Sequence, residues 1–140
     1  MAVTFHFDLV TPEKQVLSQQ EVMLTIPGAE GYFGVLPGHT PLVTLLAAGV
    51  LTLGEGRDAV RYAIAGGYAE VLPDRTTILA DRVQCWNSVD TAAVEAERRE
   101  AVERERASRD EEKTNRYWQR RVAFAQLCLD VHRDYLNRNS

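Results

Sequence analysis

The stretch 26–51, IPGAEGYFGVLPGHTPLVTLLAAGVL, decides which fold this chain can adopt. Its five glycines permit backbone angles or close approaches that a Cβ would obstruct. Its three prolines fix φ and remove backbone donors, which excludes a helix and an ordinary central strand. Because the segment is otherwise apolar and rich in turns, we expect a β-framework around it and a loop at the surface.

Short runs with alternating apolar residues surround these turns. Val3, Phe5, Phe7 and Leu9 alternate with polar residues and predict a half-buried first strand. The further strands are expected near residues 16–17, 22–26, 32–36, 42–46, 50–53, 60–65, 68–72 and 76–80. Gly66 and Gly67 should mark a strand reversal or a bulge. The pattern predicts an all-β sandwich of about 8–10 short antiparallel strands.

The composition changes abruptly along the chain. All nine glycines and all five prolines lie at or before Pro73. Residues 88–140 contain eleven basic and eleven acidic side chains, so the net charge of −4 belongs to the first 87 residues. A dense and balanced charge mixture is typical of exposed helices. We therefore expect a β-sandwich domain at 1–87 and a two-helix domain at 88–140.

The second domain has its own start and break signals. Asp90 is suited to cap a helix over about 91–107, and we expect a break at 108–110 before a second helix over about 111–137. Favourable i,i+4 pairs on the first helix are Glu95/Arg99, Glu100/Arg104 and Glu105/Arg109. No residue at the break is a strong helix breaker, so a hairpin and one continuous helix both remain open.

The second helix carries a broad apolar face that the thin apolar side of the first cannot cover. One stripe of this face is Tyr117, Phe124, Cys128, Val131 and Tyr135, and its neighbour is Trp118, Val122, Ala125, Leu129 and Leu136. The face must therefore pack on the sandwich or on another protein. The residues that we expect to face a partner are Tyr117, Trp118, Phe124 and Leu129.

Composition and charge exclude several classes of protein. With 140 residues and 45% apolar side chains, the chain is globular and has the size of one domain or a small domain with an appendage. An acidic balance argues against a nucleic-acid partner. No apolar run approaches ~18 residues, and the N-terminus resembles neither a signal nor a transit peptide. Cys85 and Cys128 lack metal-site spacing, so a reducing compartment is expected.

No catalytic constellation stands out among the residues. The three histidines, His6, His39 and His132, have no nucleophile or carboxylate at motif spacing. The glycines at 28, 31 and 34 have neither the order nor the following helix of a nucleotide-binding loop. The simplest interpretation of His39 is a turn histidine that bonds to nearby backbone. The arginines of the C-terminal helices are interpreted as residues of solvated helix faces. We expect no catalytic residue, cofactor or metal.

Two blocks of sequence carry a family resemblance. GAEGYFGVLPGHTPLVTLLAAGVL and the later AIAGGYAEVLPDRTTILAD resemble the epsilon subunit of F-type ATP synthases, which corresponds to the mitochondrial delta subunit. The resemblance implies a β-sandwich followed by a two-helix domain. It also implies a rotor role, in which the sandwich binds the gamma subunit and stands on the c-ring. The C-terminal helices of many members can extend toward the alpha and beta subunits and block ATP hydrolysis.

The resemblance also assigns contacts to particular residues. By motif position, Glu30, Gly31 and Tyr32 lie in the loop that faces the c-ring, and His39 lies near the gamma contact. Tyr32 stands where an acidic residue can occur, so it would act as an aromatic anchor instead of a charge. Some members bind ATP through an Ile/Leu-Asp-x-x-Arg-Ala motif. Here the residues 89–94, VDTAAV, lack the arginine, so we expect weak or absent ATP binding.

The resulting hypothesis is a non-catalytic central-stalk subunit of bacterial type, peripheral to the cytoplasmic face of the inner membrane. A rival hypothesis is a β-sandwich ligand-binding module with a helical dimerisation hairpin. A third hypothesis, a small hydrolase centred on His39, lacks a partner nucleophile.

Overall fold

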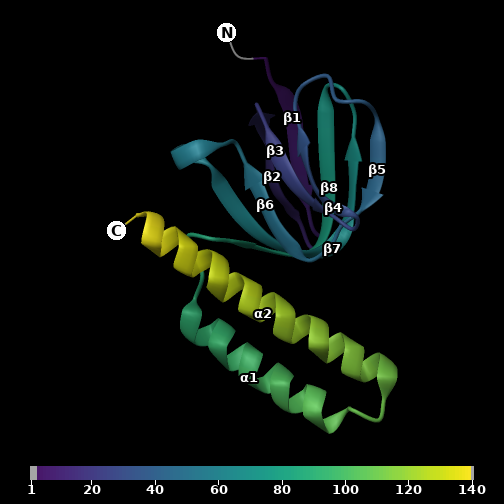
Figure 1. The fold of residues 1–140 in the computed structure, drawn as a ribbon, viewed down its shortest axis with the longest axis vertical. Helices are drawn as coiled ribbons and strands as arrows, with labels where there is room; N and C mark the ends of the chain where they lie inside the picture. The colour runs from purple at the N-terminus through teal and green to yellow at the C-terminus, as the bar shows by residue number, and fades with distance from the viewer. Residues whose placement is uncertain (1–2, 140) are drawn as a thin grey trace. The chain divides into compact units, whose positions relative to one another are not determined.

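The computed structural model describes residues 3–139 of the chain. The chain divides into two compact units, Met1–Val83 and Gln84–Ser140, which we describe separately. The first unit is built from β-strands with one short 3₁₀ helix, Gly56–Asp58, and the second contains two α-helices (Figure 1).

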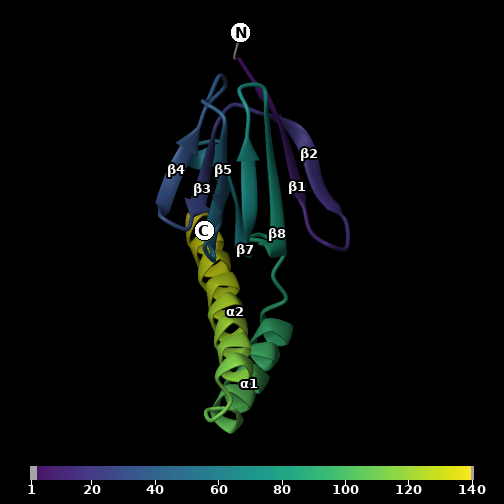
Figure 2. The ribbon, with the colours of Figure 1, turned by 90° about the vertical axis from the view of Figure 1, so that its right-hand side faces the viewer.

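The first unit is an eight-stranded sheet that curves into a flattened sandwich, which Figures 1 and 2 show from two sides. The strand order is β2-β1-β8-β7-β6-β3-β4, and β5 pairs with β7 beside this path. The strands are β1 (Phe5–Val10), β2 (Gln15–Glu21), β3 (Leu24–Gly28), β4 (Gly31–Val35), β5 (Leu42–Leu45), β6 (Gly49–Leu53), β7 (Val60–Val71) and β8 (Arg75–Cys85). The predicted all-β sandwich is confirmed.

Alternating side chains build the core of this unit. Phe5, Phe7 and Leu9 are at most 2% exposed, whereas the residues between them face outward. Their partners in the core are Leu24, Ile26, Val35, Leu46, Leu51, Leu53, Ile64, Ala69, Val71, Ile78 and Ala80. Each fully buried Leu, Ile or Phe contributes roughly 1.5–3 kcal/mol relative to an exposed one. Burial of one face of each strand therefore stabilises the sandwich.

Two details differ from the sequence-based expectation. First, β1 and β8 pair in parallel, whereas all strands were predicted to be antiparallel. Second, β7 continues from residue 60 to 71, which excludes the strand reversal that was one of the two roles expected for Gly66 and Gly67. Residues 60–64 pair with β6 and residues 68–71 pair with β5, which places the two glycines where β7 changes its partner. A Cβ on Gly67 would lie 1.9 Å from a backbone oxygen of β8, so this close crossing requires glycine.

The second unit is a helical hairpin formed by α1 (Thr91–Ala107) and α2 (Glu112–Arg138). The Asp90 side chain accepts a hydrogen bond of 3.1 Å from the Ala93 N–H, as an N-cap residue does. At the turn, the Asn115 amide and the Ser108 hydroxyl both donate to the Glu105 carbonyl, at 2.8 and 3.2 Å. The Ser108 N–H also donates to this carbonyl at 3.2 Å, so the three bonds together close the end of α1 and tie it to α2. In this structure the tail is therefore a hairpin and not one continuous helix.

Ion pairs line the surface of the hairpin. Two of the three expected pairs on α1 form, Glu100 with Arg104 at 3.5 Å and Glu105 with Arg109 at 3.8 Å. Glu95 contacts Arg98 at 3.5 Å instead of the expected Arg99.

Neither of the two described helices has the length and apolar content that a membrane crossing requires.

Candidate functional site

The β3–β4 turn lies at one end of the sandwich. Gly28 pairs with Gly31 across the hairpin, which leaves Ala29 and Glu30 at its tip. Both tip residues and Gly31 are exposed, and Gly31 has a φ of 133° that favours glycine. The Ala29 N–H donates to the Leu45 carbonyl at 2.9 Å, so the tip is also tied to β5. The turn therefore presents the Glu30 carboxylate to solvent from a braced backbone.

Tyr32 follows this turn on β4 and is 59% exposed. Its phenolic oxygen accepts a hydrogen bond of 2.9 Å from the Val50 N–H on β6. The hydroxyl of Tyr32 is therefore bonded to β6, while much of its side chain stays accessible to solvent. The sequence placed Tyr32 at the surface, but no local pattern predicted this bond.

The turn around His39 lies at the opposite end of β4 from Glu30. The His39 Nδ1 is 2.6 Å from the Thr40 carbonyl oxygen, so this nitrogen carries the proton and donates. The Gly38 N–H donates to the Pro73 carbonyl at 2.7 Å, which joins this turn to the β7–β8 turn. His39 bonds to adjacent backbone, as the simplest interpretation of the sequence expected. Because Glu30–Tyr32 lie at the start of β4 and His39 follows its end, the two predicted contact regions do not form one site.

An exposed apolar patch lies on the outer face of β5, β7 and β8, with the exposed Glu70 beside it as the register partner of Val43. It consists of Val43, Leu45, Tyr68 and Leu79, which are 70%, 65%, 50% and 41% exposed. Leu45 is the register partner of Tyr68, and the neighbouring positions Ala69 and Val71 point into the core. Exposed apolar clusters of this kind mark interaction sites. We call these four residues the outer-face patch. The sequence predicted the strands, but strand pairing was needed to gather the side chains.

A histidine, an aspartate and a serine meet on β1 and β2, which the sequence reasoning missed. The His6 Nε2 lies 3.0 Å from the Asp8 carboxylate and 3.0 Å from the Ser18 hydroxyl. A catalytic triad would need the carboxylate and the hydroxyl on different ring nitrogens. The shared nitrogen therefore makes this a structural cluster. The alternation of His6 and Asp8 on one strand face was the only sequence signal for it.

The same cluster changes the acidity of one of its members. A hydrogen bond with Ser18 is the main reason that the pKa of the Asp8 carboxyl lies below its ordinary value of 3.8. Burial acts in the opposite direction, while the hydrogen bond and charge of His6 add to the lowering. The arrangement favours an ionised Asp8 in the folded chain.

The helical unit presents only part of its predicted partner face. Tyr117 is 50% exposed, Trp118 and Leu129 are half-buried, and Phe124 is 7% exposed. Phe124 is therefore unavailable to a partner in this arrangement of the chain. The Tyr117 and Trp118 rings meet edge to face at 4.9 Å, and the guanidinium of Arg104 lies 5.5 Å from the Trp118 ring centre. This end of α2 is an aromatic surface with a cation above it.

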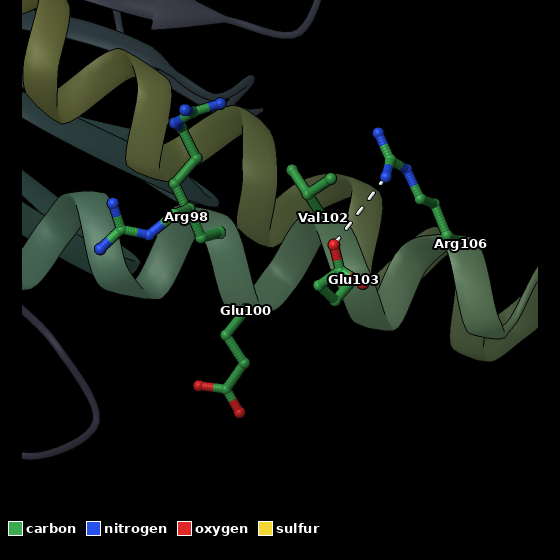
Figure 3. Close-up of a pocket in the computed structure, with 6 residues that line it drawn as sticks. Arg98, Glu100, Val102, Glu103 and Arg106 are labelled. Carbon is green, nitrogen blue, oxygen red and sulfur yellow. Dashed lines mark ion pairs between the residues drawn. The ribbon is translucent and has the colours of Figure 1, made fainter.

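A shallow hollow on α1 is lined by Arg98, Arg99, Glu100, Val102, Glu103 and Arg106 (Figure 3). Arg106 pairs with Glu103 at 3.8 Å, as the dashed line in Figure 3 marks. Because carboxylates on the same helix balance much of the positive charge, the hollow has the character of a solvated face. No group of three or more potential metal ligands occurs among residues 3–139.

Comparisons with known proteins agree with the architecture. Residues 4–85, more than half of the chain, match the family described as ATP synthase, Delta/Epsilon chain, beta-sandwich domain. The chain is 51% identical over 94 residues to an ATP synthase epsilon chain of Magnetococcus marinus, covering 67% of this chain and 69% of that one. It is 36% identical over 132 residues to the ATP synthase epsilon chain of Herpetosiphon aurantiacus, covering 94% and 95%.

Solved structures share the fold at lower identity. A chain of the mitochondrial ATP synthase of Euglena gracilis, solved with OSCP, F1 and the c-ring, superposes with a TM-score of 0.70. Its sequence identity is 23%, and the match covers 89% of this chain and 78% of that one. A chain of the Tetrahymena thermophila central stalk and c-ring gives a TM-score of 0.53 at 16% identity, covering 84% and 96%.

Proposed function

This chain belongs to the delta/epsilon family of ATP synthase chains, and on that premise we propose that it is a non-catalytic subunit of the central stalk. In this role it turns with the rotor and couples rotation of the c-ring to the gamma subunit and the catalytic head. Its work is mechanical, so it needs firm contacts at two places and no reactive group.

The outer-face patch is the observation that carries this proposal. Val43 and Leu45 are each at least 65% exposed on a paired strand, where Leu45 lies opposite Tyr68 and Val43 lies opposite Glu70. We assign this surface to the gamma subunit, with His39 at its rim because the 37–39 turn leads directly into β5. An apolar cluster that includes an aromatic residue suits a protein interface.

The β3–β4 turn supplies the second contact. Glu30 and Gly31 at its tip, with the exposed ring of Tyr32 beside them, are assigned to the c-ring. Because this tip and the His39 turn lie at opposite ends of β4, one sandwich could meet two partners at once. The complex would lie peripherally on the cytoplasmic face of a bacterial inner membrane.

The helical hairpin is assigned a regulatory role toward the alpha and beta subunits. The exposed Tyr117 ring beside the half-buried Trp118 supports a protein contact, and the charge balance of α1 supports weak or absent ATP binding. We expect faster ATP hydrolysis by an assembled complex whose subunit lacks residues 88–140. Equal hydrolysis rates with and without these residues would reject the regulatory role and leave the stalk role untouched.

Binding to purified gamma subunit tests the stalk role. Val43→Asp places a charge in the outer-face patch and should abolish most of the binding, because an ion would have to be desolvated at the interface. Val3→Asp is the matched control, since Val3 is 73% exposed and Val43 is 70% exposed. Equal gamma binding by both variants would reject the assignment. A stable homodimer that ignores gamma would instead favour a ligand-binding module with a dimerisation hairpin.

A further inference from the structure

The ladder between β3 and β6 ends early. Leu24 pairs with Leu53 and Thr25 with Thr52, and the same register would place Pro27 opposite Val50. The Pro27 carbonyl instead accepts a hydrogen bond of 2.9 Å from the Ala47 N–H. Proline also has no N–H to offer. The β3–β6 ladder therefore provides no backbone carbonyl for the Val50 N–H, which needs another hydrogen-bond acceptor.

The Tyr32 hydroxyl takes the place of the missing acceptor. Tyr32 is the register partner of Pro27 on the other side of β3, so its ring can reach across Pro27 to β6. The phenolic oxygen is 2.9 Å from the Val50 nitrogen. Gly49 supplies the space, because a Cβ there would lie 2.7 Å from the phenolic oxygen and 2.8 Å from the Pro27 Cβ. The Tyr32 side chain thus joins β4 to β6, with β3 between them.

We propose that Tyr32 is a positioning residue whose hydroxyl fastens β4 to β6 and so holds the β3–β4 turn that carries Glu30. The inference rests on the proposed function in one respect, namely that this turn meets the c-ring. A turn that transmits torque must resist bending. A hydrogen bond near the base of the β3–β4 turn shortens the part of the turn that is free to bend. The Tyr32 hydroxyl thereby holds the turn in place, whereas the exposed ring of the same residue is assigned to the c-ring contact.

The substitution Tyr32→Phe separates these two tasks, since it removes the hydroxyl and keeps the ring. In the full chain, NMR should find the Val50 amide exchanging roughly tenfold faster, as expected for the loss of one hydrogen bond. The order parameters of Ala29 and Glu30 should fall. In the assembled complex, the ratio of ATP-driven proton pumping to ATP hydrolysis should fall as well.

Two further variants sharpen this experiment. Gly49→Ala leaves Tyr32 intact but fills the space of its hydroxyl, so it should also accelerate Val50 exchange. Thr4→Val is the control, because the Thr4 hydroxyl, just before β1, donates to Gln20 on β2 at 2.9 Å, and β2 is at the other end of the strand order from β4. It removes a comparable hydrogen bond and should leave Val50 exchange, turn order and the pumping ratio unchanged.

The three measurements test the hydrogen bond, the positioning of the turn and the transmission of rotation separately. Unchanged Val50 exchange in Tyr32→Phe would refute the hydrogen bond, and faster exchange with an unchanged turn would refute the positioning role. A disordered turn with an unchanged pumping ratio would refute its importance for transmission. If the unmodified chain fails to bind gamma, the proposed function fails, while the exchange and order measurements on the isolated chain still decide what the hydroxyl does.

Discussion

Leu45 offers a quantitative test of the outer-face patch. Its side chain is 65% exposed, and complete burial of a leucine stabilises a protein by roughly 1.5–3 kcal/mol. If gamma covers the exposed part, Leu45→Ala should remove about 1–2 kcal/mol of binding free energy. Since each 1.4 kcal/mol is tenfold in affinity, the dissociation constant should rise about 5- to 30-fold.

The assay is a titration of gamma subunit with each variant by isothermal calorimetry, accompanied by urea unfolding of the isolated chain. The free energy of unfolding should change by no more than about 0.5 kcal/mol, because the side chain is mainly in water before gamma binds. Val3→Ala is the control, since Val3 is even more exposed and lies outside the patch.

Two outcomes would contradict the reasoning. An unchanged affinity for gamma would mean that Leu45 stays in solvent in the complex and that gamma binds elsewhere. A large loss of stability in the isolated chain would mean that Leu45 already packs against its own protein, and the change in affinity could then not be attributed to the interface.

Two further predictions concern the sandwich itself. Thr76 is fully buried with its hydroxyl oxygen unpaired, so Thr76→Val should raise the free energy of unfolding by about 1 kcal/mol; a lower urea midpoint would contradict this. The hydrogen bond with Ser18 holds the pKa of Asp8 below 3.8, so ionised Asp8 stabilises the fold above that pH and loses this effect as the pH falls through the folded-state pKa. Asp8→Asn should therefore be less stable than the unmodified chain at pH 7, with a difference that shrinks below pH 3.8 in urea unfolding; a difference independent of pH would count against it.

Several features of the fold could be predicted because they are local. The alternation of Phe5, Phe7 and Leu9 reports the two faces of one strand without knowledge of its neighbours. The confinement of glycine and proline to residues up to 73 separated β-structure from helices, and Asp90 marked the first helix because capping involves adjacent residues. The family motif in residues 26–51 added the stalk assignment, which the comparisons support.

Other features depended on which segments meet in space. Periodicity says nothing about a strand's partner, so the parallel pairing of β1 with β8 and the change of partner at Gly66 and Gly67 needed the closed sheet. The sequence favoured two helices in a hairpin but left one continuous helix open, and the structure forms the hairpin with the Asn115 bond to the end of α1.

The features of the candidate site also fall into local ones and ones that depend on tertiary contacts. The sequence by itself determined that residues 26–51 form a turn-rich β segment with Glu30 and Tyr32 near its surface. Only the tertiary structure brought Leu45 beside Tyr68 and carried the Tyr32 hydroxyl to Val50, because both contacts join strands that are distant along the chain. A side chain's exposure and its hydrogen-bond partner are set by all the strands around it, and no local pattern encodes them.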